Sequence, residues 1–168
     1  MELYTNLTPE EKLIKARIRL NKKSPFFSYL VMKLEFQEEN EIQTIGVDKY
    51  GNCVYNSEWI KKLTDDNITY VLAHEVLHCA LEHLIRVGVR DRETWNISGD
   101  AVINAILNES GSVGFVESGV NPNQLYDKNK KRIENVSSKT AEEIYDLIYD
   151  SKGNKNGSGF DKHIYDDS

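Results

Sequence analysis

Apolar side chains near the start of the chain are spaced in a way that predicts a helix followed by a strand. Thr8 and Glu11 form a capping-box pattern, and apolar residues then recur with helical spacing to about Asn21. The Ser-Pro pair at residues 24–25 interrupts this pattern. Aromatic and β-branched side chains dominate residues 26–36, which favours a strand there.

A hairpin and a short helix are predicted next. Residues 41–55 alternate apolar and polar side chains around Gly51, an arrangement typical of two short strands joined by a turn. Asn56 or Ser57 can then cap a short amphipathic helix that contains Trp59.

The longest apolar stretch predicts a pair of helices. Acidic residues from Asp65 onward favour a helix start, and the helical pattern predicts an end near Val87, with Gly88 as the stop signal. After a short charged turn, Thr94 can cap a second helix over residues 95–108. The short turn predicts that these two helices fold back on each other.

The remainder of the chain is predicted to hold one more helix. Residues 111–119 are glycine-rich and are expected to form a loop with a brief strand at 113–116. A capping box and an apolar stripe predict a last helix over residues 138–149. We therefore expect one domain over residues 1–150 and a disordered tail over residues 151–168.

Composition narrows the classes of protein. The 168 residues suit one domain, and a net charge of −6 gives nucleic-acid binding no support. The sequence lacks both a long apolar run and a leader-like N-terminus, so we expect a cytoplasmic protein without a membrane partner. Two cysteines, Cys53 and Cys79, make no disulfide framework. Cys79 is expected to be a packed thiol.

The segment His74-Glu75-Val76-Leu77-His78 carries the candidate chemistry. Helical positions four apart lie about 40° apart on one face, so the two imidazoles project together and can grip one Zn²⁺. Glu75 flanks them, where a general base is needed beside a metal-activated water. This HExxH pattern is the zinc metallopeptidase signature, and apolar neighbours argue against a merely solvated polar strip.

Two residues are candidates for a third metal ligand. His83 follows His78 on what reads as a continuous helix, without Gly or Pro between them, and would point about 140° away from it. Asp100 belongs to a polar ridge, with Asn96 and Asn104, on an otherwise apolar helix. The sequence leaves both open and favours Asp100, in which case His83 becomes a core residue or a support for a ligand.

At this point the chain resembles a known family, a metallopeptidase domain found at the N-terminus of bacterial proteins that end in a von Willebrand factor A-like domain. The similarity covers roughly residues 8–150 and includes the segments SPFFSYL (24–30), VYN (54–56), LAHEVLHCALEH (72–83), WNISGDAVIN (95–104) and AEEIY (141–145). Family members often carry Ala where this chain has Gly99. No von Willebrand domain follows here, so we expect a stand-alone version or a truncated chain.

The resemblance implies a zincin-like α+β domain, with a small, mostly antiparallel sheet packed on the HExxH helix and further helices. It also implies hydrolysis of a peptide or protein substrate. The spacing of His74, His78 and His83 is similar to that of gluzincin endopeptidases, in which an acidic residue of a later helix completes the metal site; this favours Asp100.

Two questions stay open at this stage. The sequence does not identify the group that stabilises the oxyanion, and Tyr70, His83, Arg86 and Tyr145 are candidates. The alternative function is a non-catalytic zinc-binding interaction or regulatory module, in which four protein ligands close the site.

Overall fold

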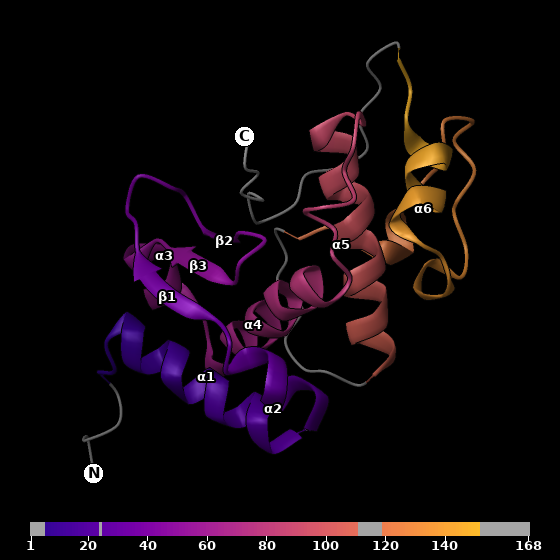
Figure 1. Ribbon diagram of the computed structural model, residues 1–168. Helices are drawn as coiled ribbons and strands as arrows, with labels where there is room; N and C mark the ends of the chain where they lie inside the picture. Colours follow the sequence, from indigo (N-terminus) through magenta and orange to yellow (C-terminus); the bar gives the residue numbers. More distant parts are fainter. Residues whose placement is uncertain (1–5, 24, 111–118, 152–168) are drawn as a thin grey trace.

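The computed structural model describes residues 6–23, 25–110 and 119–151 (Figure 1). The brief strand expected at 113–116 and the expected tail from residue 152 onward lie outside the described residues. The described elements are α1 (Pro9–Lys23), α2 (Pro25–Val31), β1 (Glu35–Glu38), β2 (Ile45–Val47), β3 (Asn52–Tyr55), α3 (Ser57–Lys62), α4 (Asp65–Ala80), α5 (Arg92–Glu109), the 3-10 turns η1 (Pro122–Gln124) and η2 (Val136–Ser138), and α6 (Ala141–Ile148). The α+β class is confirmed.

The strand expected at residues 26–36 is wrong over most of its length, because α2 occupies its first part. Pro25 stands at the first helical position, where its missing N–H is not needed. Phe27, Leu30 and Val31 then pack as a helical face against the main core. A short apolar run fits either period, and contact with α1 decides for the helix. Only the end of the run remains extended, as β1.

The hairpin is confirmed, but the sheet is mixed and not mostly antiparallel. β2 and β3 pair antiparallel, whereas β1 pairs parallel to β3 on its other side, in the order β1-β3-β2. The chain leaves β1, passes the position that β3 will occupy, and returns in the opposite direction as β2. β3 then turns back and fills the space between them, so it runs in the same direction as β1. Gly51 adopts φ +89°, and an added Cβ would lie 3.2 Å from the Lys33 carbonyl oxygen, so the turn requires glycine.

α4 is the central element of the fold. It lies between the sheet and α5 and contacts α1, α2 and β2 (Figure 1). Thr64 caps its N-terminus, where the threonine hydroxyl accepts a hydrogen bond from the Asn67 N–H at 3.2 Å. Every residue from Ile68 to His78 is buried. A helix buried on all sides must satisfy its polar side chains internally.

α4 ends well short of Val87, where the sequence predicted its end. Glu82 adopts the left-handed conformation, with φ +55°. The His83 N–H donates to the His78 carbonyl at 3.2 Å, and the Glu82 N–H donates three positions back, also at 3.2 Å. This pair of bonds is a Schellman motif. It ends the helix without the glycine that sequence reasoning required, and it turns the chain back toward α4.

α5 separates two parts of the hydrophobic interior. Its N-cap is Asp91 and not Thr94, because the Asp91 carboxylate accepts from the Thr94 N–H at 2.8 Å. Ile103 and Leu107 face the main core formed by α1 to α4 and the sheet. Other α5 side chains face a second core, which they share with α6 and the segments around η1 and η2: Ile97, Ala101, Val102 and Ala105.

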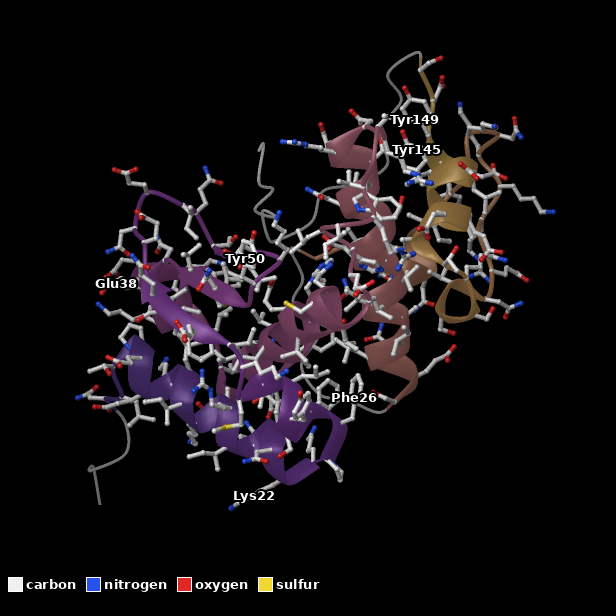
Figure 2. All side chains as sticks on the ribbon, in the orientation of Figure 1. Lys22, Phe26, Glu38, Tyr50, Tyr145 and Tyr149 are labelled. Atoms are coloured by element: carbon white, nitrogen blue, oxygen red, sulfur yellow. The ribbon has the colours of Figure 1, made fainter. Side chains whose placement is uncertain are left out.

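α6 covers the far side of α5 and begins with the capping box that the sequence predicted. Thr140 and Glu143 exchange side-chain to backbone hydrogen bonds of 2.8 and 3.2 Å. Tyr145 and Tyr149 lie near each other at one end of this layer, stacked with ring centroids 5.0 Å apart (Figure 2). Within the described part of the chain, no helix has both the length and the apolar character needed to cross a bilayer.

Candidate metal centre

Three potential donor atoms converge between α4 and α5. His74 and His78 project from neighbouring turns of α4, and Asp100 reaches them from α5. Asp100 Oδ1 lies 3.2 Å from His74 Nε2 and 2.8 Å from His78 Nε2, and the two Nε2 atoms are 2.9 Å apart. The three residues form a group able to hold a metal ion. The helix-to-helix packing predicted from the short turn thus brings the favoured residues together.

The environment of His74 fixes which of its nitrogens faces this cluster. The Asn104 side-chain nitrogen donates to the Val120 carbonyl at 2.9 Å, which directs the amide oxygen toward His74. That oxygen lies 2.7 Å from His74 Nδ1. An amide oxygen can only accept, so Nδ1 carries a proton, and Nε2 is the nitrogen that faces the donor set. Sequence reasoning placed Asn104 on the polar ridge but missed this role.

The position of His83 differs from the expectation. A continuous helix would have directed it away from His78, but the Schellman turn returns it, and the two Nδ1 atoms lie 3.2 Å apart. His83 is buried, and its carbonyl accepts a hydrogen bond from Trp95 Nε1 at 2.7 Å. In this structure His83 contacts Nδ1 of His78, the ring nitrogen of His78 that does not face the donor set. His83 thus lies outside the group of donor atoms that converge.

The donor set fits a divalent ion with a tetrahedral preference. Ligands at about 2.0–2.1 Å from Zn²⁺ in tetrahedral geometry are about 3.3 Å from one another. The observed separations of 2.8 to 3.2 Å are slightly shorter, so a small expansion would admit the ion. Two neutral imidazoles and one carboxylate are also a donor set that zinc accepts, with a fourth position left open.

Glu75 lies within the same buried turn of α4. Its side chain is fully buried, and both carboxylate oxygens are inaccessible to solvent. A carboxylate in the protein interior is costly unless nearby groups or an ion compensate for it. Glu75 follows His74 directly in the helix, which places its carboxylate at the flank of the donor set and not within it.

The other residues singled out by sequence have varied positions. Tyr70 is buried, and burial together with the charge of Asp100 raises the pKa of its phenol, which keeps it protonated. The Arg86 guanidinium binds Glu142 and the Leu81 carbonyl, while the Tyr145 hydroxyl accepts from the backbone of the turn before α5. Arg86 and Tyr145 thus have structural roles in this conformation. Cys79 is a half-buried thiol that packs against the main core, as expected.

The cluster is closed to solvent in this conformation. His74, Glu75 and His78 are 0% exposed, and Asp100 is 1% exposed. Two surface hollows of about 350 and 310 Å³ lie elsewhere: one between α5 and residues 132–137, the other beside the N-terminus of α1. Neither is lined by any residue of the cluster. A molecule from solvent can reach Asp100 or Glu75 only after a local opening.

Comparison with known proteins gives the chain its family. An uncharacterized protein of Thermotoga maritima is 32% identical over 112 residues, which cover 62% of this chain and 28% of that protein. The chain thus spans well under two thirds of the length of this relative. No solved structure matches significantly. The model of a family described as "Putative metallopeptidase domain" matches residues 8–168, nearly the whole chain, which therefore belongs to that family.

Proposed function

We propose that this chain is a zinc-dependent peptidase that hydrolyses peptide bonds of a peptide or protein substrate. The observation that carries the proposal is the convergence of His74 Nε2, His78 Nε2 and Asp100 Oδ1 in the protein interior. The family description supports the same class of reaction. We also infer a zincin-like arrangement, because the HExxH segment lies on α4, which contacts the edge strand β2.

Each polar residue of the cluster has a distinct proposed task. His74, His78 and Asp100 would hold Zn²⁺, which would act as a Lewis acid and lower the pKa of a bound water to about 7. The Glu75 carboxylate would accept a proton from the attacking water and donate it to the leaving amine. Asn104 would keep the His74 Nδ1 protonated throughout, so that Nε2 stays available.

The burial of the cluster favours one alternative. A non-catalytic zinc-binding interaction or regulatory module needs no access for substrate, and the side chains of His74, Glu75, His78 and Asp100 are all enclosed. A zinc ion held there would stabilise the packing of α4 against α5. X-ray absorption on the zinc-loaded protein separates the two functions: a light-atom ligand from water supports the peptidase, and a shell of four protein ligands supports the module.

The peptidase proposal is tested with a Glu75→Gln variant. The purified, zinc-supplemented protein is incubated with a mixed peptide library, and cleavage is expected to disappear when a chelator is added. Glu75→Gln should bind zinc with unchanged stoichiometry but lose at least about 100-fold in hydrolysis, because the amide cannot accept the proton.

Glu41→Gln is the matched control, since Glu41 is exposed and far along the chain from α4. It should cleave at the wild-type rate. Wild-type hydrolysis by Glu75→Gln would exclude Glu75 as the base. A wild-type protein that binds no zinc would remove the basis of both proposed functions.

A further inference from the structure

The helix end at Glu82 places one imidazole against another. In a Schellman motif the residue after the left-handed position commonly makes an apolar contact with a residue in the last turn of the helix. Here those two positions are His83 and His78. Their rings meet edge to face, with centroids 5.3 Å apart, and their Nδ1 atoms are 3.2 Å apart. A polar contact therefore stands where an apolar one is usual.

The imidazole of His83 is held from α5 as well. Trp95 donates its indole N–H to the His83 carbonyl, and the two rings meet edge to face with centroids 6.0 Å apart. On the same helix, a Cβ added to Gly99 would lie 2.8 Å from His83 Nδ1. The imidazole thus fills space that any larger residue at position 99 would occupy. The ring has little freedom to move away from His78.

We propose that His83 is a positioning residue for the metal site and not a ligand. A ligating His78 needs its lone pair on Nε2, which requires the proton on Nδ1. His83 Nδ1 accepts that N–H, so it holds His78 in the tautomer and ring orientation that metal binding needs. This inference rests on the proposed zinc site formed by His74, His78 and Asp100.

The two candidate histidine ligands then have separate supports. Asn104 holds His74 from α5, and His83 holds His78 from the turn that ends α4. Gly99 contributes by leaving room for the second support. The site is thereby organised before an ion arrives, and losing one support is expected to weaken zinc binding by about 10- to 100-fold.

The first test compares substitutions at position 83. His83→Leu removes the acceptor, whereas His83→Asn keeps an oxygen acceptor, as Asn104 does for His74. Zinc affinity is measured by competition with a chelating dye, after circular dichroism has shown that each variant is folded. His83→Leu should lose about 10- to 100-fold in affinity, and His83→Asn should recover most of that loss.

Ser98→Ala is the matched control on α5. Its hydroxyl donates to the Thr94 carbonyl within its own helix. Ser98 is also as fully buried as the residues of the candidate metal cluster. Its zinc affinity should equal that of the wild type. Wild-type affinity in His83→Leu would overturn the proposal.

A second readout distinguishes support from ligation. In zinc-loaded protein, ¹⁵N spectra of the imidazoles should show His78 protonated on Nδ1, and X-ray absorption should count two imidazole ligands. Three imidazoles would overturn the proposal by making His83 a ligand. If the wild type binds no zinc at all, the proposed site fails first, and this inference fails with it.

The role of Gly99 gives an independent check. Gly99→Ala should weaken zinc binding in the wild type, because the added methyl group displaces the His83 ring. In a His83→Ala background the same substitution should have no further effect on affinity, since the ring is absent. Equal losses in both backgrounds would contradict the contact on which the proposal depends.

Discussion

At the scale of single residues, the orientation of one amide determines which nitrogen of His74 faces the candidate metal site. Asn104 binds the Val120 carbonyl with its nitrogen and His74 with its oxygen, at 2.9 and 2.7 Å. Both contacts are buried, so neither is easily exchanged for water. In the neutral form of a histidine whose Nδ1 is held in this way, Nε2 is the nitrogen without a proton.

Asn104→Leu is therefore expected to lower zinc affinity by about 10- to 100-fold, because leucine accepts no hydrogen bond from His74 Nδ1. The measurement is the same chelator competition. Asn108→Leu is the control, one turn further along α5 and exposed. Its affinity should stay at the wild-type value, and an equal loss in both variants would contradict the orienting role of Asn104.

At the scale of elements, the end of α4 is the feature that the sequence predicted least well. The HExxH segment, the hairpin and the capping boxes are local patterns, and each is present in the structure. The left-handed Glu82 has no such signal, because glycine or asparagine usually marks that position. The His83 carbonyl, directly after the left-handed residue, accepts a hydrogen bond from Trp95, and this tertiary contact is not visible in the local sequence.

The candidate site was partly predictable for the same reason. Two residues of one helix face can be paired from their spacing alone, which identified His74 and His78. Asp100 was favoured because it belongs to a polar ridge on an otherwise apolar helix, and such a ridge faces either solvent or a site. The contact between His78 and His83 depends on a left-handed turn and on the space at Gly99, and neither can be seen in a pattern of polar and apolar residues.

The strain at Glu82 predicts opposite effects of two substitutions. Glu82→Gly relieves a conformation that costs about 1–2 kcal/mol and loses about 0.5–1 kcal/mol to chain entropy, so stability should hold or rise slightly. Gly88→Ala introduces that cost at φ +58° and should destabilise by about 1 kcal/mol. Denaturant unfolding of the zinc-free proteins measures both. Destabilisation of similar size in the two variants would show that Glu82 is not strained.

At the scale of the whole molecule, one ion pair joins the turn after α4 to the outer layer. Arg86 binds the Glu142 carboxylate through two nitrogens, one of them at 2.9 Å, and also binds the Leu81 carbonyl at 2.6 Å. The same guanidinium lies over the Trp95 ring. The pair thus ties α6 to the turn that carries His83.

This pair gives stability a defined dependence on pH. The hydrogen bond from Arg86 lowers the pKa of Glu142 below its usual 4.5. The stabilisation of the folded state by ionised Glu142 is therefore complete above pH 4.5 and is lost as the pH falls through the lowered pKa of this residue. Unfolding measured between pH 7 and pH 3 should show a smaller acid-induced loss in Glu142→Gln than in the wild type, by under about 1 kcal/mol. Glu134→Gln, at an exposed pair with Arg132, should match the wild type.

The enclosure of the candidate donors has a kinetic corollary. An atom at the midpoint of His74, His78 and Asp100 would have no direct route to bulk water, because the protein surrounds all three side chains. A bound ion could dissociate only after a local unfolding event that separates α4 from α5. The residence time of the ion would then depend more on the rate of this local opening than on the strength of the bonds between the ion and its ligands.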